Sequence, residues 1–123
     1  PIDRLKIMAN LGAMAVKDGQ RAIMAGNLPE ALAKADQAIE YLEPVLRSPL
    51  MGDGIPNASM ANALVLKFKA KATGFGSIDI ALLQRALSHL NVAARTIRDN
   101  PQLVQMAREC ELLISRYPGQ LPK

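Results

Sequence analysis

The sequence is poor in aromatic residues and in the side chains that most often carry enzyme chemistry. It has no tryptophan, two phenylalanines, two tyrosines, one histidine and one cysteine. Half of the 123 residues are nevertheless apolar, so Ala, Leu, Met and Ile must fill the interior. This composition is typical of closely packed helices rather than of sheets, and it is too apolar for a disordered chain.

The chain also lacks a second cysteine and any long apolar run. Because Cys110 stands alone, no internal disulfide can form, and we expect a cytoplasmic protein. No apolar run approaches the roughly 20 residues that span a bilayer. Residues 1–4 do not resemble the start of a signal peptide. We therefore expect no membrane insertion.

Positive charge is present but scattered. The formal net charge is +4, and the only close basic run is Lys67, Lys69 and Lys71. On a helix Lys67 and Lys71 share a face while Lys69 points elsewhere. A nucleic-acid site would need stacking aromatics and a dense basic stripe, which are missing. We interpret the run as a solvated face and expect no nucleic-acid partner.

The clearest structural signal is a helix stop followed at once by a helix start. Gly26 suits the position just past a helix end, where φ becomes positive. Asn27 can cap the next helix, with Pro29 in its first turn and Glu30 at the capping-box position. Two helices joined by so short a link must lie antiparallel.

Similar signals divide the rest of the chain, with Asp3, Ser77 and Asn100 as further capping residues. No strand pattern occurs, so we predict an all-α fold, an antiparallel bundle of four to five helices. The bundle forms a single domain over 1–117, followed by a short tail over 118–123. The predicted helices are about 3–25, 28–47, 58–73, 78–98 and 101–116.

Three local features carry their own expectations. Gly12 and Gly19 share a helix face, which indicates either the close approach of another backbone or relief at a kink. Pro44 is expected to kink or end the second helix near residues 41–43. Residues 50–57 are rich in turn residues and are interpreted as a connecting loop without phosphate or calcium spacing.

We predict no catalytic, cofactor or metal site. His89 lies at the border of an apolar stripe and is interpreted as a boundary histidine. Cys110 lies within an apolar repeat and is interpreted as a small core residue rather than a nucleophile. The carboxylates fall on polar faces without the pairing that acid–base catalysis needs. An enzyme is therefore not expected.

Six methionines are the one compositional oddity. Methionine usually fills gaps in a core, but it also lines adaptable grooves that take a partner's apolar helix. From the helical stripes, the candidate groove residues are Met8, Leu11, Met60, Leu64, Val65 and Phe68.

The first four predicted helices also show the residue spacing of a known family. The matching positions include Leu5, Met8, Gly12, Ala13, Ala22, Ile23, Gly26 and Ala38. With these residues, the stretch 1–97 resembles the flagellar secretion chaperones, although Asn10 and Leu11 replace that family's Tyr-Asp pair. The resemblance implies a non-enzymatic cytoplasmic chaperone whose grooves hold the disordered, helix-forming terminus of a flagellin-like export substrate.

A second resemblance leads to an alternative. The small-residue spacing of Gly19, Gly26, Leu28, Ala31 and Ala38 is similar to a tetratricopeptide helical hairpin. Ala22 and Ala35 stand where that repeat has large aromatics, and no second copy is present. The alternative is an interaction or oligomerisation module with another partner, including a possible homodimer.

Overall fold

The computed structural model describes residues 2–50 and 52–120, and within these ranges it contains helices and no strand. The all-α prediction of an antiparallel bundle is confirmed, with five α-helices and a final 3-10 turn. These elements are α1 (Ile2–Met24), α2 (Leu28–Arg47), α3 (Gly54–Phe75), α4 (Ile80–Thr96), α5 (Pro101–Ser115) and η1 (Pro118–Gln120).

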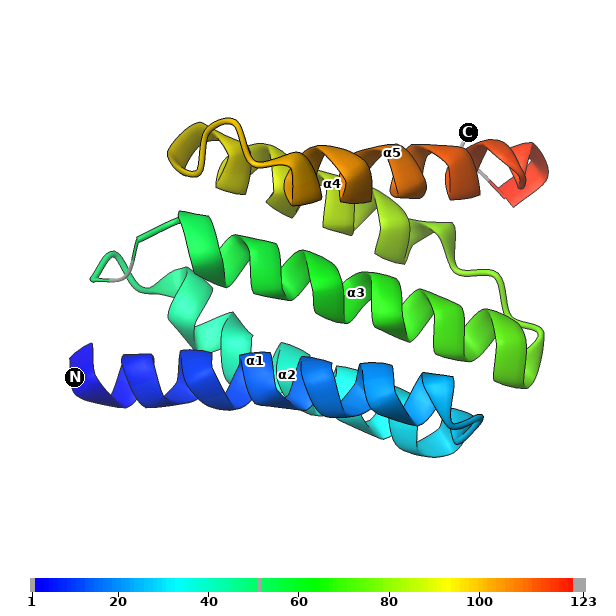
Figure 1. Cartoon of the computed structure of the whole chain (residues 1–123), viewed down its shortest axis with the longest axis horizontal. Helices are drawn as coiled ribbons and strands as arrows, with labels where there is room; N and C mark the ends of the chain where they lie inside the picture. Colours follow the sequence, from blue (N-terminus) through cyan, green and yellow to red (C-terminus); the bar gives the residue numbers. More distant parts are fainter. Residues whose placement is uncertain (1, 51, 121–123) are drawn as a thin grey trace.

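The helices lie in two layers (Figure 1). In that view α1, α3 and α5 form the front layer, and α2 and α4 lie behind them. Each helix packs mainly against its neighbours in sequence, and α1 also contacts α3. α3 is therefore the central helix of the bundle.

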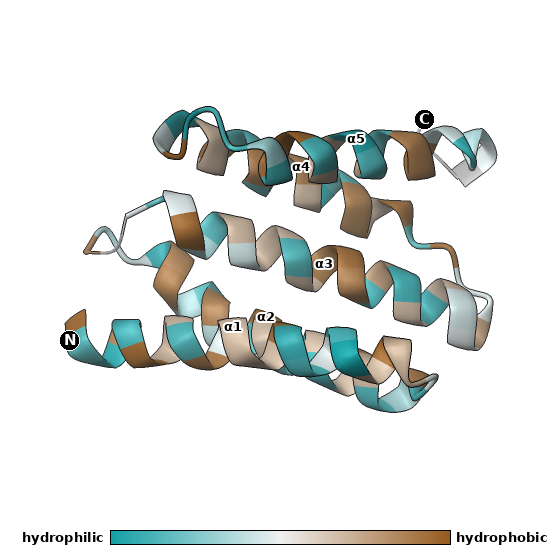
Figure 2. Ribbon diagram, in the orientation of Figure 1, coloured by the Kyte–Doolittle hydropathy of each residue, from teal (hydrophilic) through white to brown (hydrophobic). Residues whose placement is uncertain are grey.

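α3 is buried on most of its circumference. Its fully enclosed side chains include Met60 and Leu64, which join Leu42 of α2 and Leu83 of α4 in the main core. Along the part of α3 that Figure 2 shows, hydrophobic and hydrophilic residues alternate. Ser59, Asn62 and Lys69 of α3 remain partly or fully accessible to solvent.

The α1–α2 hairpin packs closely because glycines remove side chains from the contact. A Cβ atom on Gly12 would lie 2.7 Å from Cγ of Leu42. A Cβ on Gly19 would overlap the Leu66 side chain and lie 3.2 Å from Cβ of Lys34. Of the two explanations for these glycines, close approach holds, although the close neighbour of Gly12 is the Leu42 side chain and a backbone atom, Ala31 O at 3.4 Å, is near only at Gly19.

The turn between α1 and α2 has the predicted chemistry. Gly26 has φ of +77°, and its N–H donates to Ile23 O at 3.0 Å. The Asn27 N–H donates to Ala22 O at 2.8 Å, which completes a Schellman ending. Oδ1 of Asn27 accepts from the Glu30 N–H at 3.3 Å, and Nδ2 donates to the Glu30 carboxylate at 2.9 Å. The antiparallel hairpin follows from this turn.

The third helix begins four residues earlier than predicted, at Gly54 rather than 58. Asp53 takes the N-cap position, and Pro56 lies in the first turn, where its missing N–H is not needed. The prediction of a loop over all of 50–57 is wrong for this reason. The helix also continues past 73 to Phe75.

Other helix ends differ by smaller amounts. Ser77 does not cap the fourth helix, since Asp79 takes that position without a side-chain bond to the helix. Asp3 lies inside the first turn of α1 and is not its cap. Pro44 does not end α2, which continues to Arg47. The helices α1, α4 and α5 stop at Met24, Thr96 and Ser115, slightly before their predicted ends at 25, 98 and 116.

Some predictions concern residues outside the described ranges. These are Pro1 at the start of the predicted domain, Met51 of the connecting loop and residues 121–123 of the tail.

The glycine contact between α1, α2 and α3 leads to a stability prediction. Gly19→Ala should lower the free energy of unfolding by about 1–3 kcal/mol, because the added methyl overpacks a filled interface. This loss should appear despite the higher helix propensity of alanine. Urea denaturation of both proteins measures it.

The control is Gly52→Ala, whose Cβ would meet no atom within 4 Å. It should leave the stability unchanged or raise it by less than about 1 kcal/mol. If Gly19→Ala were as stable as this control, the hairpin would not be packed as described.

Candidate protein-binding groove

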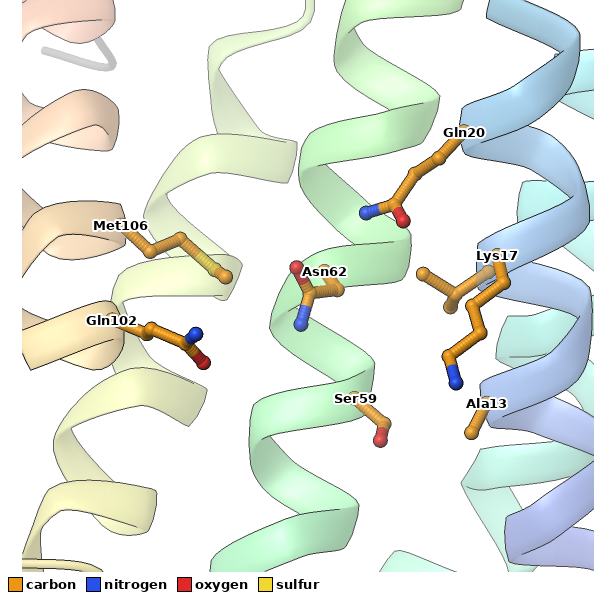
Figure 3. A pocket seen from close by; sticks show the side chains of 8 residues that line it. Ala13, Lys17, Gln20, Ser59, Asn62, Gln102 and Met106 are labelled. Atoms are coloured by element: carbon orange, nitrogen blue, oxygen red, sulfur yellow. The ribbon is translucent and has the colours of Figure 1, made fainter. Parts of the chain in front are cut away.

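A cavity of about 480 Å³ opens on the front layer, between α1, α3 and α5. Figure 3 shows its side chains converging from these helices. Five of its eight lining residues are polar, with three carboxamides, one hydroxyl and one lysine beside three apolar residues. The lining residues are Ala13, Val16, Lys17 and Gln20 of α1, Ser59 and Asn62 of α3, and Gln102 and Met106 of α5.

A second cavity of about 390 Å³ adjoins the first and shares Gln20, Asn62 and Met106 with it. It is more apolar, and its further lining residues are Ile23, Met24, Val65, Leu66, Lys69 and Glu109. We call the two cavities together the front groove. The front groove has a polar half toward Lys17 and an apolar half toward Met24.

The polar half offers hydrogen-bonding groups that the fold does not use. The structure shows no side-chain hydrogen bond or ion pair for Lys17, Gln20 or Gln102 within the described residues. Nδ2 of Asn62 donates to Ala58 O at 3.1 Å, while its Oδ1 has no partner among these bonds. These groups remain available to a ligand.

The wall formed by α5 is joined to α3 by an ion pair. Nζ of Lys69 lies 2.5 Å from Oε1 of Glu109, beside the apolar half. Both side chains are about half exposed, so the pair contributes little and is screened by salt. Tyr117 adds an edge-on contact with Phe68, at 6.4 Å between ring centroids.

The basic run on α3 is not a freely solvated face. Besides the pair made by Lys69, Lys67 reaches Asp36 of α2 at 2.7 Å, and Lys71 reaches Asp79 at 3.2 Å. Each of these lysines therefore bridges α3 to a different element. The absence of a nucleic-acid partner stays a prediction.

The predicted groove residues are not brought together. Met60, Leu64 and Phe68 are 0–2% exposed and belong to the core, so they do not line a groove as we expected. Val65 lines the apolar half. Met8 is half-buried and Leu11 is exposed, both on α1 and outside the front groove.

The apolar stripes of the sequence do not indicate the polar lining of this groove. A usable signal was present, since Ala13, Lys17 and Gln20 follow the i, i+4, i+7 spacing of one helix face. The members of the pairs Ser59–Asn62 and Gln102–Met106 are three and four residues apart, so each pair also shares one helix face. What the spacing did not reveal is that these three faces meet.

Cys110 is a core residue, as predicted. Its side chain is fully buried, and burial raises the pKa of the thiol to about 11, with the nearby Glu109 acting in the same direction. The thiol is therefore protonated and enclosed at neutral pH.

His89 is a boundary residue that ties α4 to the start of α3. Its Nδ1 lies 2.8 Å from Oδ1 of Asn57, and Nδ2 of Asn57 donates to Asp53 O at 2.7 Å. Because the Asn57 oxygen accepts, Nδ1 of His89 carries the proton in this arrangement. Burial and the positive charge of Arg85 lower the pKa of His89.

In residues 2–50 and 52–120, no three His, Cys, Asp or Glu side chains gather in a way that suits a metal ion. No helix in the same part of the chain is long and apolar enough to cross a membrane.

Comparison with known proteins gives no relative. No protein-family model, curated protein or solved structure matches this chain.

The enclosure of Cys110 leads to a labelling prediction. A thiol-specific chromogenic reagent at pH 8 should leave the folded protein unmodified, because a pKa of about 11 instead of 9.0 leaves about 100-fold less thiolate. Absorbance of the released chromophore measures the reaction. The same protein in denaturant should react fully, and rapid labelling of the folded protein would contradict the buried position.

The bond between His89 and Asn57 leads to a pH prediction. Because the folded state lowers the pKa of His89, the unfolded state binds more protons below about pH 6.5. The His89 contribution to stability is therefore present above pH 6.5 and is lost as the pH falls through the lower, folded-state pKa. Urea denaturation at pH 7.5 and 5.5 measures this loss.

The matched variant is His89→Gln, which keeps a donor for Asn57 but cannot titrate. Its unfolding free energy should fall less between the two pH values than that of the parent protein. An equal pH dependence of the unfolding free energy in both proteins would show that the pKa of His89 does not change on folding.

Proposed function

We propose that this chain is a non-enzymatic protein-binding domain whose front groove holds a segment of a partner protein. The supporting observation is the unused hydrogen-bonding capacity of Lys17, Gln20 and Gln102 in a groove that runs across three helices. Ligand sites are typically concave, with apolar walls and a few convergent polar groups, and the front groove has this character.

The structural roles of the two most reactive side chains support a non-enzymatic function. Cys110 is enclosed in the core, and His89 is engaged with Asn57 at the start of α3. Neither lines either half of the front groove. The groove therefore offers binding groups without a nucleophile and base in contact with each other.

The specific partner that we propose comes from the resemblance to flagellar secretion chaperones. In this proposal a cytoplasmic chaperone holds the disordered terminus of a flagellin-like export substrate and prevents its premature assembly. Ordering such a segment costs conformational entropy, which lowers the net affinity and favours later release. The helical bundle and its open groove are compatible with this role.

An interaction module with another partner is the second candidate, and the order of the helices favours it. Successive hairpins pack on one another, and alternate helices form each layer, as in stacked helical repeats. In addition, Ile7, Leu11 and Met14 form an exposed apolar stripe on α1, which would suit contact with a second copy.

A peptide titration tests the proposed partner. A fluorescent peptide from a flagellin C-terminus should bind the purified chain, and Ala13→Gln should weaken the binding at least about tenfold, because the larger side chain fills the polar half. Fluorescence anisotropy measures the affinity. Ala33→Gln is the control, since Ala33 is exposed on α2 in the rear layer.

Light scattering on the same samples separates the two candidates. A stable dimer that ignores the flagellin peptide would rule out the chaperone proposal and leave the oligomerisation module.

A further inference from the structure

We infer that the front groove takes its partner segment in extended conformation, with a carboxylate of that segment placed at Lys17. This inference rests on the proposed protein-binding function and specifies the chemistry of the segment. It starts from the lining of the polar half, which Figure 3 shows in detail.

Three carboxamides converge on the polar half from three different helices. They are Gln20 of α1, Asn62 of α3 and Gln102 of α5. A carboxamide both donates and accepts hydrogen bonds, and an extended peptide presents N–H and C=O groups in alternation. The carboxamides therefore match the exposed backbone of an extended segment, whatever its side chains.

A helical segment would match this lining poorly. Its backbone groups are already bonded within the helix, so its apolar face would cover the carboxamides without pairing them. Each polar group buried in this way would lose its hydrogen bonds to water without gaining new ones, which weakens binding. The lining thus favours an extended segment over the helical one that the sequence led us to expect.

The charge of the groove selects for an acidic segment. Lys17 is the one charged residue among those lining the polar half, and it makes no ion pair with the described residues. In the apolar half Lys69 and Glu109 neutralise each other. The uncompensated charge is therefore positive, and its complement is an Asp or Glu side chain.

The two halves also set a spacing for the segment. Lys17 and Met24 are seven positions apart on α1, which corresponds to roughly 10 Å along the helix. An extended chain covers this length in about three residues. The segment should therefore carry its acidic residue about three positions from a large apolar residue that lies near Ile23, Met24 and Val65.

A random peptide library displayed on phage, selected on the purified full chain, tests the inference. Selected peptides should share an acidic residue about three positions from a large aliphatic one. For a synthetic fluorescent copy, Lys17→Gln should weaken binding at least about fivefold and reduce its salt dependence. Carbon chemical shifts of a labelled, bound peptide should report extended backbone.

The control variant is Arg47→Gln, which removes the same charge from the exposed end of α2 in the rear layer. It should leave the affinity unchanged, while Lys17→Arg should retain most of it. An equal loss of peptide affinity in Lys17→Gln and Arg47→Gln would show that only the net charge of the protein matters, and this would overturn the inference.

The remaining outcomes separate the inference from the proposed function. Selected peptides that lack an acidic residue, or that show helical chemical shifts when bound, would overturn the inference. The proposed binding groove would still stand if Ala13→Gln weakens the binding of those peptides. Selection of no peptide, or of peptides indifferent to Ala13→Gln, would overturn both.

Discussion

The burial of α3 is the constraint on which the rest of the structure depends. A helix enclosed by the α1–α2 hairpin on one side and by α4 on the other keeps few accessible side chains along its length, among them Ser59, Asn62 and Lys69 of the groove lining. The hairpin can approach it so closely because Gly19 leaves room for Leu66. With the rear occupied by α2 and α4, the flanking helices α1 and α5 fall on either side of the exposed strip. The front groove is therefore a direct consequence of how the core is built.

The groove differs from the binding surface that methionine content suggested. Its larger cavity presents carboxamides and a lysine, and the second cavity is the more apolar of the two. Apolar side chains of α3 that were available for a groove are instead used against α4, where burial stabilises the fold by about 1.5–3 kcal/mol for each large side chain. Recognition at such a surface depends on hydrogen bonding and charge, which favour specificity more than raw affinity.

The sequence predicted the helices well where local chemistry decides, as at Gly26 and Asn27, whose turn has the expected bonds. It failed at residues 54–57, since glycine and proline within a first turn look the same as a loop. It also failed for Met60 and Phe68, because an apolar stripe does not say which neighbour covers it. The groove could not be predicted for the same reason, because its lining comes from faces of three helices that are far apart in the sequence.

The walls of the groove are not equally fixed. The α1 wall is locked to α2 and α3 by glycine-mediated packing, whereas α5 has a smaller contact with α4 and is joined to α3 through Lys69–Glu109 and Tyr117. A shift of α5 would break one screened ion pair and would also pull Leu103 and Cys110 out of the main core, while the α1–α2–α3 packing stays intact. The width of the groove is therefore set on the α5 side by the same buried side chains that complete the main core.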